Sequence, residues 1–222
     1  VSTSVPSRSK MSAGIARRTL PCSAMNAAMR AYYDARAAEY DQWWLGTGLY
    51  AQRERPGWHE DVEALCAALA ALPPARTLDV ACGTGFLTRH LPGDVTGLDQ
   101  SAEMVEIASA RVPRVVRGDA LAPPFADGAF ERVATGHFYG HLDAGQRERF
   151  LAQARRLADE LVVVDSARRP DGEDEAWQER TLNDGSRHRV YKRWFTAAGL
   201  ADELGGGEVV HAGPWFVAVR AR

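Results

Sequence analysis

Apolar residues recur along the chain with two different periods, one typical of strands and one typical of helices. Short apolar runs predict buried strands, at 76–81, 94–99, 114–119, 129–136 and 160–166. Between these runs, apolar residues spaced three or four apart predict helices, at 58–72, 86–91, 101–112 and 143–158. Such alternation predicts a doubly wound α/β fold, a parallel sheet with helices on both faces. In folds of this kind the ligand binds at the carboxyl ends of the strands.

Polar residues mark where two of these helices begin. Ser101 is placed to be the N-cap of the helix at 101–112, because its hydroxyl can accept from a free backbone N–H of the first turn. Asp143 and Gln146 have the spacing of a capping box at the start of the helix at 143–158. These local signals support both helices independently of the apolar pattern.

After the fifth strand the simple alternation ends. Residues 177–195 predict a β-hairpin with its turn at Asn183-Asp184-Gly185. The remaining predicted elements are a helix at 25–45, a short helix at 196–204 and an antiparallel strand pair at 208–213 and 215–222. With that pair, the fold becomes a Rossmann-like sheet of seven strands, mostly parallel, with an antiparallel C-terminal edge.

Residues 1–24 differ from the rest of the chain, because they carry four basic residues and no acid. This composition predicts a flexible basic tail, with a second plausible start at Met25. An organelle-targeting peptide would have a similar composition, and that alternative stays open. We expect residues 25–222 to form one domain.

Bulk composition excludes several classes of protein. The net charge of −2 and the pI of about 6.3 indicate no surface for gripping nucleic acid or an anionic membrane. No apolar stretch is long enough to predict a membrane-spanning helix. Three unclustered cysteines, Cys22, Cys66 and Cys82, argue against a disulfide framework or a metal site, and fit the reducing cytoplasm. The oligomeric state stays open.

Three acids lie at corresponding places in the predicted fold. Asp79, Asp99 and Asp119 come at or near the ends of three successive strands, twenty residues apart in each step. A doubly wound sheet lines them along one edge, around a crevice. Asp99 stands at the end of the strand that follows the glycine-rich turn, where an acid can accept hydrogen bonds from ribose hydroxyls. The ligand is therefore expected to contain a ribose.

The turn after the first strand, Gly83-Thr84-Gly85, narrows the choice of ligand. Thr88 occupies the place of the third glycine of a dinucleotide fingerprint, and no lysine follows Gly85 as a Walker loop would require. Asp79, just before the turn, would repel a pyrophosphate and attract an ammonium group. A nucleoside with a cationic amino-acid tail meets these conditions, and S-adenosylmethionine is such a molecule.

Four stretches carry a resemblance to a known family. "LDVACGTG" and "VTGLDQSAEMVEIA" resemble the first two motifs of class I S-adenosylmethionine-dependent methyltransferases, and "RGDALAPPFADGAFERV" resembles their third and fourth. "YYDARAAEYD" is similar to the opening helix of the branch that acts on small molecules. The resemblance runs from about residue 32 to the end, with Ala81 where many members have glycine.

The resemblance implies roles at the cofactor. Gly83 and Gly85 would let the backbone approach it, and Asp79 would lie near its methionine amino group. Asp99 would take the ribose hydroxyls, and Asp119 the adenine amino group. The other implied cofactor contacts are Tyr33, Arg36, Tyr40, Ala81, Gln100, Met104, Ala120 and His137. For the aromatic residues and Met104, simple packing stays open as the alternative.

Candidates for catalysis follow the fourth strand, in "ATGHFYGHL". Methyl transfer from a sulfonium is an in-line displacement, which needs a base only when the nucleophile arrives protonated. His137, Tyr139 and His141 are placed to supply one, although a hydrogen bond at the entry to the next helix would explain His141, and a purely structural role stays open for His137. The segment lacks the [DNS]-P-P-[YFW] motif of enzymes that methylate the amines of bases, so methylation of nucleic acid is disfavoured.

The predicted hairpin is rich in cations and occupies the place of a substrate cover. The pattern "RTLNDG…R…K" in the hairpin and the earlier "HFYGHL" resemble small-molecule O-methyltransferases that act on phosphonates in antibiotic biosynthesis, and that resemblance implies substrate contacts at Arg180, Arg189 and Lys192. Because side chains alternate along a strand, only about half of the hairpin cations can point inward. A fully solvated hairpin is the alternative.

We therefore expect a cytoplasmic enzyme that uses S-adenosylmethionine to methylate a small anionic or polar metabolite, at oxygen. Two other functions fit parts of the pattern. A non-catalytic module could bind S-adenosylmethionine through the same acids, and a nicotinamide-dependent oxidoreductase could use a similar sheet.

Overall fold

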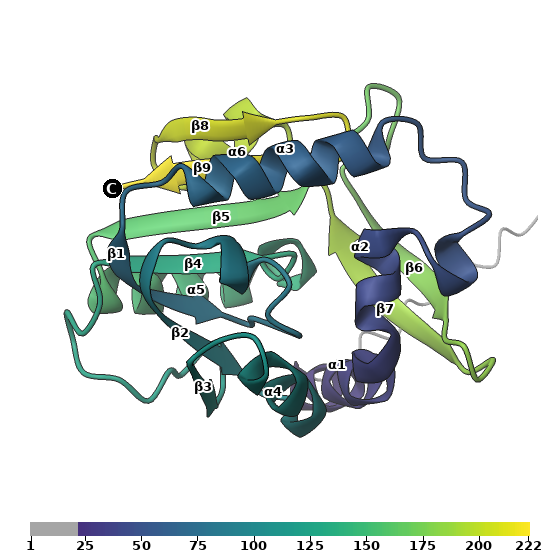
Figure 1. The fold of residues 1–222 in the computed structure, drawn as a ribbon, viewed down its shortest axis with the longest axis horizontal. Helices are drawn as coiled ribbons and strands as arrows, with labels where there is room; N and C mark the ends of the chain where they lie inside the picture. Colours follow the sequence, from purple (N-terminus) through teal and green to yellow (C-terminus); the bar gives the residue numbers. More distant parts are fainter. Residues whose placement is uncertain (1–21) are drawn as a thin grey trace, which may run out of the picture.

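The computed structural model describes residues 22–222, so nearly all of the expected basic tail lies outside the described residues. Seven strands form the main sheet in the order β3-β2-β1-β4-β5-β9-β8 (Figure 1). Its strands are β1 (Ala75–Val80), β2 (Gly93–Asp99), β3 (Arg114–Arg117), β4 (Arg132–Gly136), β5 (Glu160–Ser166), β8 (Glu208–Ala212) and β9 (Phe216–Ala221). The helices are α1 (Cys22–Arg36), α2 (Tyr40–Leu45), α3 (Trp58–Ala70), α4 (Ala102–Ser109), α5 (Ala144–Leu157) and α6 (Ala197–Glu203).

The pairing of the strands confirms the predicted fold class. Strands β1 to β5 are all parallel, with β1 and β4 at the centre. Strand β9 runs antiparallel to β5, and β8 runs antiparallel to β9. This places β9 between β5 and β8 and makes the antiparallel C-terminal edge.

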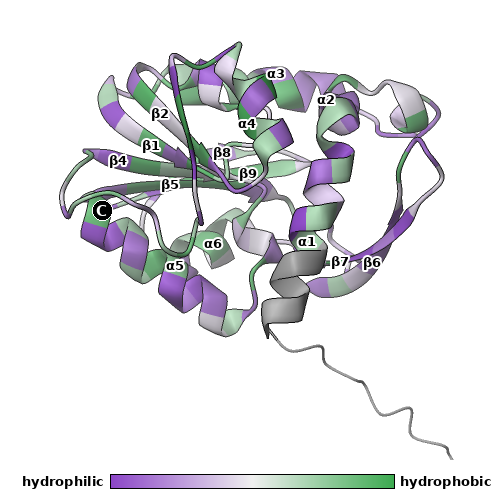
Figure 2. Cartoon of the chain, turned by 90° about the horizontal axis from the view of Figure 1, so that it is seen from below, coloured by the Kyte–Doolittle hydropathy of each residue, from purple (hydrophilic) through white to green (hydrophobic). Residues whose placement is uncertain are grey.

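Each face of the sheet has its own apolar core. On one face, Phe150 and Leu157 of α5 and Leu200 of α6 pack against β4, β5 and β9. On the other face, Leu65 and Leu69 of α3 pack against the same strands. Figure 2 shows α5 and α6 on one side of the sheet and α3 and α4 on the other, with apolar strands between them.

The predicted caps are confirmed, but the helix predicted at 86–91 is wrong. The Ser101 hydroxyl accepts from the backbone N–H of Met104, and Asp143 and Gln146 form the capping box. After β1 only a single 3₁₀ turn forms, at Thr88–His90. The left-handed Gly85 bounds this stretch at its start, and the extended Leu91 bounds it at its end, because a residue before proline is disfavoured in the helical conformation.

The helix predicted at 25–45 is broken into two. Helix α1 ends at Arg36, a 3₁₀ turn spans Ala37–Glu39, and α2 ends at Leu45, before the left-handed Gly46. The two parts pack against different elements. Helix α1 contacts α4, whereas Trp44 of α2 stacks on Phe86 in the core between α3 and the sheet. The break after Arg36 lets residues 22–45 contact both α4 and this core.

The predicted hairpin is confirmed as β6 (Glu175–Thr181) and β7 (Arg187–Arg193), which form a separate two-stranded sheet. It stands beside α1 and α2, and it does not extend the main sheet at either edge strand, β3 or β8 (Figure 1). Its tip is tied to the turn after α1, because the Asn183 backbone N–H donates to Glu39 Oε2 at 2.8 Å. The hairpin therefore faces the carboxyl ends of the parallel strands.

Candidate active site

A cavity of about 140 Å³ lies at the carboxyl ends of β1, β2 and β4. We call it the strand-end cavity. Many of the residues that the sequence singled out line it, namely Tyr33, Tyr40, Ala81, Gly83, Asp99, Gln100, Met104, Asp119, Ala120, His137 and His141. Four of the predicted cofactor and catalytic residues do not: Arg36, Asp79, Gly85 and Tyr139.

Asp99 and the glycine turn form the floor of this cavity. The Asp99 carboxylate accepts from the backbone N–H of Gly83 through Oδ2 and of Ser101 through Oδ1, both at 2.9 Å. Burial raises the pKa of Asp99, and these N–H groups act against that rise. Gly83 is left-handed with φ +55°, and so is Ala81 with φ +57°, where an L side chain is strained. This backbone leaves little side-chain bulk between the turn and a ligand.

Asp79 is held beneath the cavity instead of lining it. Its carboxylate is buried and accepts from the Thr88 hydroxyl at 2.5 Å. Burial raises the pKa of Asp79 to about 7, although the Thr88 hydrogen bond lowers it. Thr88, which departs from the dinucleotide pattern, thus binds the strand-ending acid. Gly85 lies apart as well, because a Cβ there would come within 3.1 Å of Val112.

His137 is a buried, neutral base on a strained backbone. Its φ is +55°, and its Nδ1 lies 3.3 Å from Ser166 Oγ. Within the described part of the chain, its buried Nε2 has no hydrogen-bond partner. Burial, together with the charge of Lys192, lowers the pKa of His137 to about 3. The ring is therefore neutral at physiological pH.

His141 has its tautomer fixed by the hairpin. Its Nδ1 lies 2.6 Å from the backbone carbonyl of Tyr191, and a carbonyl only accepts, so Nδ1 carries the proton. Burial and the charge of Lys192 hold the pKa of His141 well below its usual range. In the neutral ring Nε2 then keeps a lone pair, which can accept a proton or a hydrogen bond.

Tyr139 is directed away from the cavity. Its hydroxyl donates to Glu203 Oε1 at 3.0 Å, and its ring packs between Phe150 and Phe195. Burial raises the pKa of Tyr139 further above its usual range. This geometry suits packing of α5 and α6 against the sheet and does not suit proton transfer at the cavity.

A second cavity, of about 520 Å³, lies between α1, the end of β5 and the hairpin. We call it the cation-rich cavity, because Arg36, Arg180 and Lys192 all line it. Arg189, the third predicted substrate residue, does not line it. It lies on the other face of β7, exposed, with its guanidinium 5.0 Å from the Trp177 ring. Strand alternation therefore brings two of the three predicted cations to the cavity.

Asp165, at the end of β5, organises this region and was not singled out from the sequence. It is fully buried, forms an ion pair with Lys192 and accepts from the backbone N–H of Gly140 at 2.7 Å. Burial acts to raise the pKa of Asp165, but Lys192 and His137 keep it below its usual range. The sequence could have pointed to Asp165, because "VVVD" ends an apolar strand with an acid, as the stretch ending in Asp99 does.

The two cavities share a wall. The Arg36 guanidinium lies 4.7 Å from the Tyr40 ring, and Arg36 lines the cation-rich cavity whereas Tyr40 lines the strand-end cavity. His137 and Ser166 form a second such pair, again with one residue on each cavity. Ligands in the two cavities would therefore be separated by little more than one layer of side chains.

The lining of the strand-end cavity carries groups that suit a nucleoside with an amino-acid tail. Asp99 and Asp119 supply carboxylates at the ends of neighbouring strand–helix units, and the fully buried Met104 supplies an apolar wall for a base. The left-handed Ala81 and Gly83 expose backbone for close approach. Among the described residues, no group of three or more His, Cys, Asp or Glu could hold a metal ion. In the same range no helix is long and apolar enough to cross a membrane.

Comparison with known proteins is consistent with this arrangement. Residues 77–160 match a family described as a methyltransferase domain. An uncharacterised methyltransferase of Alkaliphilus oremlandii is 25% identical over 167 residues, which cover 72% of this chain and 75% of that protein. The dTDP-3-amino-3,6-dideoxy-alpha-D-glucopyranose N,N-dimethyltransferase of Streptomyces fradiae is 36% identical over 157 residues, covering 64% of this chain and 58% of that protein.

Solved structures extend the likeness to nearly the whole chain. A complex of DhpI with SAM and HEP has a TM-score of 0.70 and 26% identity, and the alignment covers 89% of this chain and 97% of that one. A complex of DhpI with SAH has a TM-score of 0.67 at the same 26% identity, covering 91% and 98%. The fold of this chain thus matches that of DhpI over most of both chains, and the two DhpI complexes hold SAM and SAH.

Proposed function

Because the chain is an S-adenosylmethionine-dependent methyltransferase, we propose that its acceptor is a small anionic metabolite, which binds in the cation-rich cavity and is methylated at oxygen. One observation carries this proposal. Arg36 is only 5% exposed, yet it forms no ion pair with a carboxylate anywhere in residues 22–222. Its one hydrogen bond to a side chain goes from Nη1 to the Tyr32 hydroxyl, at 3.0 Å.

A buried cation without an anionic partner is costly. Proteins normally pair such a charge, because desolvation of an ion is repaid only by an opposite charge or by hydrogen bonds. Arg180 lines the same cavity, and within the described range it too has no carboxylate partner. An anionic ligand between Arg36 and Arg180 would supply the missing charge through charge-assisted hydrogen bonds.

Lys192 adds a third positive charge that is fixed in place. Its ion pair with the buried Asp165 ties β7 to β5, so the ammonium cannot swing away from the cavity. The Asp165 charge is shared with the backbone N–H groups of Gly140 and Ser166, both at 2.7 Å. Part of the Lys192 charge is therefore left to act on an acceptor in the cavity.

The chain's own contribution to methyl transfer is binding, alignment and exclusion of water. When bound, S-adenosylmethionine supplies an electrophilic methyl group to the acceptor. The shared wall of Tyr40 and His137 would set the direction between the two ligands, which is the main requirement of an in-line displacement. An acceptor oxyanion needs no base, and the cations would hold it in place.

The histidines have roles that depend on the acceptor. If the acceptor oxygen carries a proton, His141 is a candidate base, because Nδ1–H is held by the Tyr191 carbonyl and Nε2 of the neutral ring keeps a lone pair, although burial holds the His141 pKa well below its usual range as well. His137, with its pKa near 3, would accept a hydrogen bond and would not store a proton. Acceptor identity therefore decides whether proton transfer belongs to the reaction at all.

Turnover with labelled S-adenosylmethionine tests the proposal. A panel of small phosphonates, carboxylates, phenols and amines should give methylation of the anionic members. With the best acceptor, Arg180→Gln should raise KM about tenfold or more, which is the loss of a charge-assisted hydrogen bond, while cofactor affinity stays unchanged.

Arg189→Gln is the matched control, since it removes an arginine from the opposite face of the same hairpin. Its KM should stay within about twofold of the wild type, because surface charges contribute little. Equal effects of the two variants, or methylation confined to neutral phenols and amines, would contradict the proposed acceptor.

A further inference from the structure

The mouth of the cation-rich cavity holds a second set of arginines. Arg53 and Arg55 follow α2, and Arg169 lies in the loop after β5; we call these three the outer arginines. Arg53 and Arg169 are exposed and Arg55 is half-buried, whereas Arg36 and Lys192 at the inner end are buried. The cavity therefore has positive charge at both of its ends.

Two of the outer arginines lie over tryptophan rings. The Arg55 guanidinium lies 3.8 Å from the Trp58 ring, and the Arg169 guanidinium lies 4.4 Å from the Trp215 ring. The two indoles also touch each other, with 5.3 Å between their centroids. Arg55, Trp58, Trp215 and Arg169 thus form one continuous row of contacts, in which the two indoles meet edge to face.

Hydrogen bonds fix this row of contacts in place. Nε1 of Trp58 donates to the Trp44 carbonyl and Nε1 of Trp215 donates to the Pro56 carbonyl, both at 2.9 Å. Nη1 of Arg55 donates to the Trp43 carbonyl at 3.0 Å. A guanidinium that lies over a ring can still present N–H groups at its edge, and such groups match an oxyanion in a bidentate manner.

The charge of the outer arginines is not cancelled by neighbouring acids. Within residues 22–222 none of the three forms an ion pair with a carboxylate. Glu54, Glu173 and Glu179 also line the cavity, but Glu179 is paired with Arg187 across the hairpin. Three arginines therefore face two unpaired glutamates, and the mouth keeps an excess of positive charge.

The volume of the cavity indicates what this second set is for. About 520 Å³ is in the range of pockets that enclose drug-sized ligands, well above the size of a single small anion. We propose that the acceptor is an extended molecule with two anionic groups, one bound by Arg36 and Arg180 and the other by Arg55 and Arg169. This inference rests on the proposed function, because it assigns the inner end of the cavity to the acceptor's reacting anion.

Binding of simple phosphonates to the complex with S-adenosylhomocysteine tests the inference by calorimetry. The probes are n-alkylphosphonates and alkane-α,ω-bisphosphonates of increasing and matched chain length. At the chain length that spans both arginine sets, the bisphosphonate should bind about tenfold or more tightly than the matched alkylphosphonate, the gain from an added charge-assisted contact.

Two variants on separate segments, Arg55→Gln and Arg169→Gln, should each remove most of that gain and leave alkylphosphonate affinity unchanged. The matched control is Arg89→Gln, because Arg89 also stacks on an aromatic ring, Phe86 at 4.6 Å, but lines neither cavity. Arg89→Gln should bind the bisphosphonate as much more tightly than the alkylphosphonate as the wild type does.

The outcomes separate this inference from the proposed function. If alkylphosphonates bind and no bisphosphonate gains affinity, or if the gain survives in both variants, the second anionic subsite is wrong and the proposed function stands. If neither kind of probe binds the wild-type complex, the assignment of the cation-rich cavity to an anionic acceptor is itself wrong.

Discussion

At the scale of single residues, three acids that share one sequence pattern, a position at or near the end of a strand, have different surroundings in the structure. Asp79, Asp99 and Asp119 were all found by counting from strand ends, and parallel register makes such counting reliable. Asp99 and Asp119 line the strand-end cavity, whereas Asp79 is held below it by Thr88. Counting locates a carboxylate along a strand, but it cannot tell which neighbouring hydroxyl binds it. That depends on the path of the turn that follows.

The buried state of Asp79 predicts an unusual dependence of stability on pH. Burial raises its pKa to about 7, so between about pH 4 and pH 7 the folded state keeps a proton that the unfolded state has lost. The free energy of unfolding should therefore fall as pH rises through this window, by at most about 1.4 kcal/mol per pH unit from this group. Asp79→Asn removes that contribution.

Urea unfolding of the two proteins at a series of pH values measures the difference. The advantage of Asp79→Asn over the wild type should grow from about pH 4 to pH 7 and then stay level. The lowered pKa values of His137 and His141 act in the opposite direction, but they act alike in both proteins and cancel. Parallel curves for the two proteins would show that Asp79 ionises normally.

At the scale of elements, the spacing of apolar residues predicted the strands, and the turn residues predicted the hairpin. Neither was used to predict which cations of the hairpin point into the cavity. The alternation rule itself holds the answer, because Arg189 and Lys192 are three residues apart on β7 and so lie on opposite faces. The cavity arginines from other segments could not be found this way. Arg36, Arg55 and Arg169 meet only because the break after α1 and the loop after β5 turn toward the same place.

Helix α4 offers a test of a predicted local signal. The Ser101 hydroxyl accepts from the Met104 backbone N–H at 3.2 Å and caps the helix that carries Met104 into the cavity. Ser101→Ala should lower the free energy of unfolding by about 1 kcal/mol, the usual loss for an N-cap. In Ser109→Ala, the matched control, the lost hydroxyl bonds only to the Val105 carbonyl of the same helix, and stability should change by less than about 0.5 kcal/mol. Equal losses in urea unfolding would contradict the cap.

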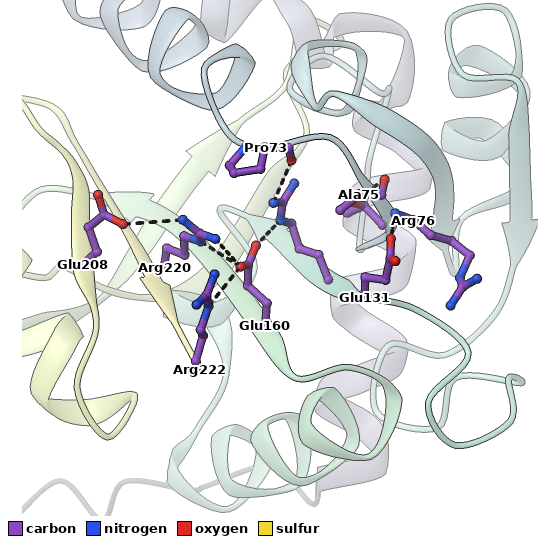
Figure 3. A network of polar contacts seen from close by, with 10 residues as sticks. Pro73, Ala75, Arg76, Glu131, Glu160, Glu208, Arg220 and Arg222 are labelled. Carbon is purple, nitrogen blue, oxygen red and sulfur yellow. Dashed lines mark hydrogen bonds and ion pairs between the residues drawn. The ribbon is translucent and has the colours of Figure 1, made fainter.

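At the scale of the whole molecule, binding and stability depend on opposite ends of the sheet. Both cavities lie at the carboxyl ends of the parallel strands. At the amino ends, Glu160 Oε1 lies 2.5 Å from Arg132 Nε of β4. Glu160 Oε2 lies 2.6 Å from Arg220 Nη2 of β9, and Figure 3 shows Glu160 and Arg220 side by side. Arg132 is 1% exposed and also donates to the Pro73 carbonyl. This network links neighbouring strands at the end of the sheet that lies away from the two cavities.

Such a separation predicts that Glu160→Gln weakens the fold and leaves binding intact. The variant would leave the buried Arg132 charge without its carboxylate, a loss on the order of 3 kcal/mol in the free energy of unfolding. Affinity for S-adenosylmethionine by calorimetry should not change, because the cofactor would bind at the other end of the strands. Glu208→Gln is the matched control, since Glu208 is largely exposed and 3.6 Å from Arg220, and it should cost less than about 1 kcal/mol.

The pH dependence of this loss distinguishes a charge effect from a simple packing defect. Burial acts to raise the pKa of Glu160, but hydrogen bonds from Arg220 and Arg132 hold it below its usual range. The carboxylate's stabilisation is therefore complete above the usual glutamate pKa and is lost as pH falls through the lowered value in the folded state. The gap between wild type and Glu160→Gln should shrink in that acid window. A gap that stays constant with pH would assign the loss to packing, and weaker cofactor binding in the variant would show that the two ends of the sheet are coupled.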